Sequence, residues 1–132
     1  MFDNFMIVTN NPLVKTKLGE EYHVEYHDSS YEDTLKIVRD YIYLGHQLLS
    51  HPLSGSVKPN ETPYKSTMLA RDKKAVDVQS VEIIENVLQA IQKFEMKSTQ
   101  YKPEVYADFQ LIDFTLIDSA IPSATRWQNN SL

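Results

Sequence analysis

The 132-residue chain contains no cysteine. Without thiols it cannot form disulfides, thiolate nucleophiles, zinc–thiolate sites or iron–sulfur ligation. It also lacks any apolar run near the roughly 20 residues that cross a bilayer, and its first residues lack the basic region of a secretion signal. We therefore expect a cytoplasmic protein with no membrane partner, whose chemistry depends on groups other than sulfur.

Glycine is scarce, with three residues, and neither a G-x-G-x-x-G turn nor a G-x-x-x-x-G-K-[ST] loop occurs. Standard dinucleotide and Walker-type nucleotide sites are therefore disfavoured. The four histidines form no H-E-x-x-H pair. His23 and His27 fall in an expected strand, where a spacing of four residues separates them by ~13 Å. We expect no metal and no cofactor.

Basic residues are outnumbered, 13 against 18 acidic ones, which gives a net charge of -5. This balance disfavours nucleic acid, because such binding draws its affinity from Lys and Arg that neutralise phosphates. Between Ser56 and Lys74, however, five basic residues face only Glu61 and Asp72. This segment could attract a small anion, although an ordinary solvated surface explains it as well.

The composition, with 42% hydrophobic and 23% charged residues, is that of a globular protein. We expect a single domain over residues 1–121 and a polar tail over residues 122–132. Phe5–Val8 suits a buried strand, and Asn11 and Pro12 are typical of a helix start. A second strand is predicted over Tyr22–Tyr26.

Helical spacing then begins after Ser30, with Tyr31, Leu35, Val38 and Ile42 on one face and Gly45 at the end. Strands are predicted over residues 46–50 and 65–70. The next helix is expected to be capped by Ser80, and its apolar face is predicted to consist of Ile84, Val87, Leu88, Ile91 and Phe94.

The last helix is predicted from Pro103 to Pro122, since proline suits a first turn and interrupts a helix interior. Its Asp108, Asp113 and Asp118 do not share one face and are expected on a solvated surface. The apolar stripe is predicted to consist of Val105, Phe109, Ile112, Leu116 and Ala120.

Strands that alternate with helices predict an α/β domain with a mostly parallel sheet of about four strands. Helices would flank both faces in a Rossmann-like three-layer arrangement, and two helices would lie at the C-terminal end. Between the expected third and fourth strands lies a polar loop over residues 51–65. Structureless loops longer than ~12 residues are uncommon in compact domains and are often functional.

Three segments together resemble the GrdX family: Phe5–Val14, the loop His51-Pro-Leu-Ser-Gly-Ser-Val-Lys-Pro-Asn-Glu-Thr-Pro-Tyr-Lys65, and Asp108–Asp113. The loop is the most specific of the three, and the likeness spans residues 5–121. The resemblance implies a small soluble protein encoded beside glycine, sarcosine or betaine reductase genes in anaerobic amino-acid fermenters. It implies no established activity and no catalytic residues. Such reductases depend on selenol and thiol chemistry, so a cysteine-free chain is expected to be an accessory.

Ligands of open α/β sheets bind outside the carboxyl ends of the strands. In a parallel sheet, the segment after the first strand and the 51–65 loop would meet at that edge. Helix-end donors, lysine charges, serine hydroxyls and a tyrosine wall would then hold a small anionic molecule. The predicted ligand-binding residues are Thr9, Asn10, Asn11, His51, Ser54, Ser56, Lys58, Asn60, Tyr64 and Lys65.

Two alternatives remain open from the sequence. The chain could be a small enzyme, a transferase or lyase acting on a carboxylated or phosphorylated metabolite, with His51 as general acid–base. It could instead dock onto a reductase subunit or onto a second copy of itself, as a homodimer. The sequence leaves the catalytic residues unknown.

Overall fold

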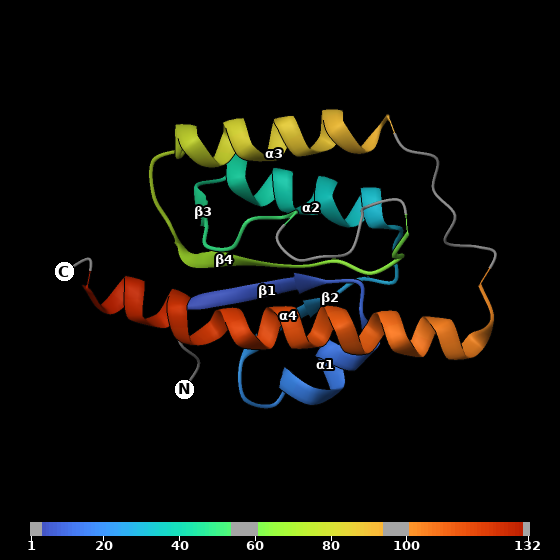
Figure 1. Cartoon of the computed structure of the whole chain (residues 1–132). Coiled ribbons are helices and arrows are strands. Elements are labelled where there is room, and N and C mark those ends of the chain that lie inside the picture. The colour runs from blue at the N-terminus through green and yellow to red at the C-terminus, as the bar shows by residue number, and fades with distance from the viewer. Residues whose placement is uncertain (1–3, 54–60, 94–100, 131–132) are drawn as a thin grey trace.

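A computed structural model describes residues 4–53, 61–93 and 101–130, with side chains to residue 124. The elements follow in the order β1 (Phe5–Thr9), α1 (Pro12–Leu18), β2 (His23–Tyr26), α2 (Tyr31–Tyr43), β3 (His46–Leu48), β4 (Ser66–Lys73), α3 (Val78–Ile91) and α4 (Pro103–Asn130). The four strands form one sheet in the order β2-β1-β4-β3. Helices α2 and α3 cover one face, and α1 and α4 cover the other (Figure 1).

The sheet is mixed, so the prediction of a mostly parallel sheet is wrong, and the Rossmann-like arrangement is not confirmed. β1 and β2 are parallel, but β4 is antiparallel to both β1 and β3. Parallel neighbours need a crossover connection, usually a helix, whereas antiparallel strands do not. A helix separates β1 from β2, but in its described part the connection from β3 to β4 has none. The chain therefore turns back on itself there.

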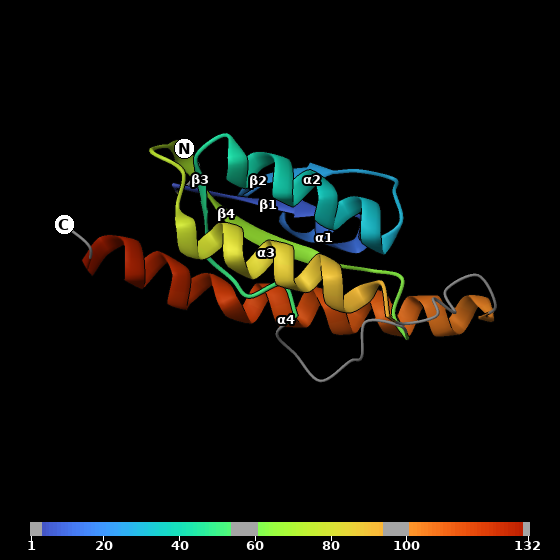
Figure 2. The same cartoon turned by 90° about the horizontal axis from the view of Figure 1, so that it is seen from above.

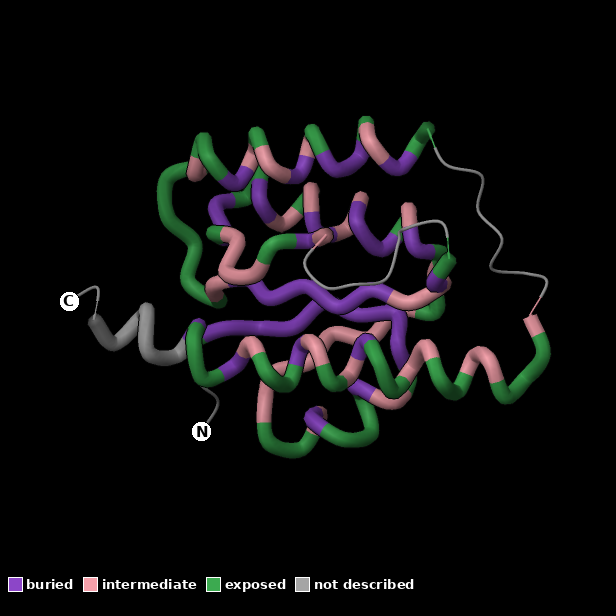
Figure 3. Tube along the Cα trace, in the orientation of Figure 1, coloured by how far each residue is buried: buried purple, intermediate pink, exposed green. Residues whose placement is uncertain are grey.

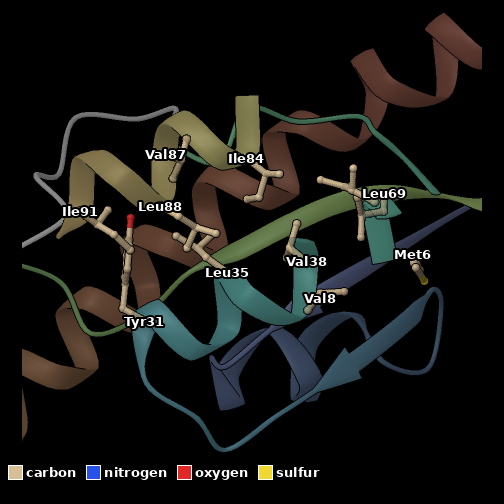
Figure 4. Packing of buried hydrophobic residues seen from close by; sticks show 11 residues of the cluster. Met6, Val8, Tyr31, Leu35, Val38, Leu69, Ile84, Val87, Leu88 and Ile91 are labelled. Atoms are coloured by element: carbon tan, nitrogen blue, oxygen red, sulfur yellow. The ribbon is translucent and has the colours of Figure 1, made fainter. Parts of the chain in front are cut away.

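Strand β1 is buried on both faces, because its alternating side chains supply two separate cores. Met6 and Val8 point towards α2 and α3, whereas Phe5 and Ile7 pack with α1 and α4. In the first core, Tyr31, Leu35 and Val38 of α2 face the apolar side of α3 (Figure 4). The helical periodicity of both segments is thus confirmed within the described residues; Phe94 lies outside them.

Most helix ends lie where the sequence predicts them. The Asn11 side chain caps α1 with Pro12 at its first position, and the Ser30 side chain caps α2. Gly45 follows α2 with φ 109, a left-handed conformation that suits glycine. The start of α3 differs, because its N-cap is Asp77 and Ser80 lies inside the helix. Ser80 Oγ instead donates to Asp77 and accepts from the Leu48 amide at 3.0 Å.

Helix α4 is longer than predicted and runs through Pro122 to Asn130, so the expected tail boundary at 121/122 falls inside a helix. Its buried stripe also differs from the predicted one. The inward residues are Asp113, Ile117, Ile121 and Ala124, whereas Ile112 is 40% exposed. Figure 3 shows buried, intermediate and exposed residues succeeding one another along this helix, and Figure 2 shows from above that α4, on the opposite face of the sheet from α3, extends past α3 at both ends.

No helix in the described ranges combines the length and the apolar character needed to span a bilayer.

Candidate functional site

Six polar residues gather where β1 ends and β4 begins. The two strands pair Thr9 with Ser66, and α4 crosses beside them. Every member of this group is buried, with at most 8% of its surface exposed. We call it the polar cluster, and its members are Thr9, Asn10, Asn11, Lys65, Ser66 and Asp113.

Asp113 is the anchor of the polar cluster on α4. Its Oδ2 accepts from Ser66 Oγ at 2.6 Å and from Asn11 Nδ2 at 3.0 Å, and its Oδ1 accepts from the Ser66 amide at 3.1 Å. The expectation that this carboxylate lies on a solvated surface is therefore wrong. A carboxylate can be buried when hydrogen bonds replace its hydration, and three donors do so here.

The hydroxyls of the polar cluster form a directed chain. Ser66 Oγ uses its single hydrogen on Asp113, so its 2.7 Å contact with Thr9 Oγ1 must be donated by Thr9. Thr9 Oγ1 in turn accepts from the Asn11 amide at 2.9 Å. These hydrogen bonds therefore connect the start of α1, through the neighbouring ends of the central strands β1 and β4, to α4.

Asn10 joins three segments that are distant in sequence. Its Nδ2 donates to the carbonyls of Ser29 at 2.9 Å and Pro63 at 2.8 Å, and its Oδ1 accepts from the Lys65 amide at 2.8 Å. Of the described part of the 51–65 loop, Pro63 and Lys65 therefore lie beside the segment near residue 10, whereas His51 does not. Asn10 uses both donors and its acceptor inside the protein.

Asn11 is occupied in the same way. Its Nδ2 donates to the Gln110 carbonyl as well as to Asp113, and its Oδ1 accepts from the Leu13 amide at 3.0 Å. The groups predicted to offer helix-end donors to a ligand are thus engaged with the protein itself. Asn10 and Asn11 hold the site together, and a ligand would meet other groups.

Lys65 differs from its neighbours in the polar cluster. Its residue surface is 8% exposed, yet its ammonium has no hydrogen-bond or ion-pair partner among the described residues. Burial lowers the pKa of Lys65, and the negative charge of Asp113 opposes that shift. Burial likewise raises the pKa of Asp113, against the hydrogen bonds from Ser66 and Asn11 and the charge of Lys65.

Aromatic and polar side chains surround the outer rim of the polar cluster. Tyr64 OH accepts from Gln110 Nε2 at 2.8 Å, and Lys15 Nζ lies 5.2 Å from the centre of the Tyr26 ring. Burial, with the negative charge of Asp113 as a second cause, raises the pKa of Tyr31. The rim therefore offers aromatic surface and the exposed cation of Lys15, beside the largely buried Lys65 side chain.

The other predicted binding residues are placed differently. His51 lines a separate pocket with Ala120 and Ser123 of α4. Ala120 lies seven residues beyond Asp113, or about 10 Å along the helix axis. Ser54, Ser56, Lys58 and Asn60 lie outside the described residues. Of the predicted set, Thr9, Asn10, Asn11, Tyr64 and Lys65 come together, and His51 does not join them.

The sequence analysis missed Ser66 and Asp113. Ser66 lies in the strand predicted over residues 65–70, and no other feature of the sequence distinguishes it. Asp113 interrupts an apolar stripe at helical spacing, together with Ile117 and Ile121, and that interruption is the feature that could have identified it. Histidine, aspartate and glutamate in the described ranges form no group of three able to hold a metal ion.

The raised pKa of Asp113 predicts a pH dependence of stability. A carboxyl whose pKa is higher in the folded state than in the unfolded state keeps its proton to a higher pH when folded. Its contribution to the free energy of unfolding is therefore full below about pH 3.9 and is lost as the pH rises through the folded-state pKa. The stability advantage of the wild type over Asp113→Asn should therefore shrink from pH 4 upwards, as measured by urea unfolding at several pH values. A constant difference would contradict the assignment.

Residues 6–122, most of the chain, match the family described as GrdX-like protein. The chain belongs to the GrdX-like protein family. Apart from Phe5, the match covers all residues of the four strands, the polar cluster and most of α4, and it confirms the resemblance found in the sequence. Family membership associates this GrdX-like protein with glycine reductase-type systems. Comparisons with curated proteins and with solved structures gave no match.

Proposed function

We propose that this GrdX-like protein is an accessory of glycine reductase metabolism that binds a small anionic molecule at Lys65. The observation that carries the proposal is the largely buried Lys65 side chain, whose ammonium has no hydrogen-bond or ion-pair partner among the described residues and whose pKa burial lowers. Burying a charge costs free energy unless an opposite charge or hydrogen bonds replace its water. A bound anion would supply that counter-charge.

The surroundings of Lys65 favour a ligand with one negative charge. Asp113 lies close enough for its charge to act on Lys65, and it would repel a dianion more strongly than a monoanion. Tyr64 and Tyr26 offer aromatic surface at the rim, and Lys15 adds a second positive charge. A small carboxylate with a short apolar part fits this environment best.

The opposed pKa shifts of Lys65 and Asp113 also favour a second candidate, a small enzyme that uses the two groups as acid and base. Three donors already occupy both oxygens of Asp113, however, and each belongs to the protein. Such a carboxylate suits an anchor better than a proton carrier. Binding is therefore the function that the geometry supports more strongly.

Replacing Lys65 by methionine tests the proposal. The substitution removes a partly desolvated ammonium and keeps a long apolar stem, so we expect the free energy of unfolding to rise by about 1 kcal/mol. Acetate at constant ionic strength should raise the melting temperature of the wild type, because a ligand that binds only the folded state stabilises it. It should not raise that of Lys65→Met.

Lys17→Met is the matched control, because Lys17 is an exposed lysine on α1 and the change in net charge is the same. We expect this variant to keep the acetate response of the wild type. Equal responses from wild type, Lys65→Met and Lys17→Met would assign any acetate effect to general salt action and would refute the Lys65 site.

A further inference from the structure

A pocket of about 470 Å³ opens beyond the outer edge of β3, between the start of α3 and α4. The β3 side of the pocket includes Gln47, Ser50 and His51, α3 contributes Gln79, and α4 contributes Ala120 and Ser123. Three elements that are distant in sequence thus converge on one hollow. Its volume lies in the range of small-molecule sites, roughly 300–1,000 Å³.

Among the described residues, the lining contains no aspartate, glutamate, lysine or arginine. Besides glutamine, serine and histidine, these lining residues are leucine and alanine, so polar side chains lie next to apolar surface. The N-terminus of α3 does not make the pocket attractive to anions either, since the Asp77 carboxylate caps it and accepts from the Ser80 amide at 3.0 Å. A charged ligand would lose its hydration here without gaining a counter-charge.

Two backbone amides beside the pocket already have hydrogen-bond acceptors within the protein. Ser80 Oγ accepts from the Leu48 amide, and Ser50 Oγ accepts from the Met68 amide at 2.9 Å. By contrast, among the described residues the side chains of Gln47, Gln79 and Ser123 have no protein partner, and all three are exposed. These groups are available to a ligand.

His51 adds a directed donor. Its Nδ1 accepts from the Leu53 amide at 3.1 Å, so the neutral ring carries its proton on Nε2. The imidazole therefore presents an N–H donor from the β3 end of the pocket, while each glutamine amide can both donate and accept.

We propose that this pocket is a second binding site, separate from Lys65, for a small uncharged molecule that carries an amide or hydroxyl group beside a short apolar part. The apolar part would lie on Leu48, Leu49 and Ala120, and the polar part would bond to Gln47, Gln79 and His51. The site depends neither on an anion nor on the polar cluster.

N-methylacetamide is a suitable probe, with acetate and methylammonium as charged controls of similar size. We expect N-methylacetamide to shift the NMR amide signals of Gln47, His51 and Ser123 along a saturable one-site curve. Each charged probe should bind there at least about tenfold more weakly, a difference of about 1.4 kcal/mol. Any acetate effect at Lys65 would appear at different signals, those of Asn10 and Tyr64, so the two proposals can fail independently.

Ser123→Leu should fill the pocket from α4 and weaken N-methylacetamide binding at least about tenfold. Ser119→Leu, one turn earlier on the exposed surface of the same helix, should leave it unchanged. If Ser123→Leu does not fold, Gln79→Leu, which should close the pocket from α3, is the test variant used instead. The proposal is overturned if no saturable shifts occur, if acetate binds the pocket as tightly, or if both serine variants behave alike.

Discussion

Asp113→Ala is expected to lower the free energy of unfolding by about 3 to 4 kcal/mol. The substitution leaves Ser66 N–H, Ser66 Oγ and one of the two Asn11 Nδ2 hydrogens without an acceptor, and both residues are buried. Leaving a buried donor without a partner costs about 1 to 3 kcal/mol. Urea unfolding should show a lower midpoint with an unchanged slope, because the surface exposed on unfolding stays the same.

Asp118→Ala is the matched control for this prediction. Asp118 lies five residues further along α4 and is exposed, so its removal should change stability by no more than about 0.5 kcal/mol. Ser66→Ala and the double variant Asp113→Ala/Ser66→Ala complete a double-mutant cycle. The two single losses of unfolding free energy should be strongly non-additive, because Asp113 and Ser66 share hydrogen bonds. If Asp113→Ala and Asp118→Ala lowered the free energy of unfolding equally, the hydrogen bonds to Asp113 would not stabilise the fold as predicted.

The helical parts of the fold were largely predictable because their determinants are local. The apolar spacing of Tyr31, Leu35 and Val38 defines the buried face of α2, and the Asn11 and Ser30 side chains cap the helices that follow them. Strand direction is a tertiary property, and the mixed sheet was missed. The cue was present, since no helix was predicted between the third and fourth strands, and such a connection favours antiparallel pairing.

The face of α4 was predicted incorrectly because a carboxylate occupies its buried stripe. A prediction that places apolar residues inward buries Ile112 and exposes Asp113, yet three buried hydrogen-bond donors surround the Asp113 carboxylate where β1 ends and β4 begins. Those donors come from Asn11 and Ser66, about 100 and about 50 residues away in the chain. Helical spacing could place Asp113 on a stripe with Ile117 and Ile121, but it contains no information about the hydrogen-bond partners that allow the carboxylate to be buried.

Part of the candidate site lies as predicted, but antiparallel pairing of β1 with β4 is the reason, and not the parallel sheet on which the prediction was based. The chain leaves β1 at Thr9 and enters β4 at Ser66, and these residues are paired neighbours, so the loop before β4 must end beside Asn10. What the sequence could not supply was the role of each side chain. Asn10 and Asn11 were assigned to ligand binding, and their hydrogen-bonding groups are instead engaged within the protein.

Asn10→Ala is expected to lower the free energy of unfolding by about 2 to 3 kcal/mol. It removes three hydrogen bonds that tie the Ser29 carbonyl, the Pro63 carbonyl and the Lys65 amide to one side chain. The Lys65 amide should also exchange with solvent faster, because a lost hydrogen bond lowers the free energy of local opening. Urea unfolding and hydrogen exchange monitored by NMR measure the two effects.

Two further variants separate this linking role from general damage near the site. Thr16→Ala removes one exposed hydroxyl hydrogen bond on the adjacent helix α1 and should cost no more than about 0.5 kcal/mol. Asn10→Asp keeps an acceptor for the Lys65 amide but turns a carboxylate towards two carbonyls, so it should destabilise at least as much as alanine. If Asn10→Asp retained wild-type stability, the donated bonds to Ser29 and Pro63 would contribute nothing, and Asn10 would not link the three segments. The acetate response at Lys65 should weaken in both Asn10 variants, because the backbone that carries Lys65 loses its fixed position beside β1.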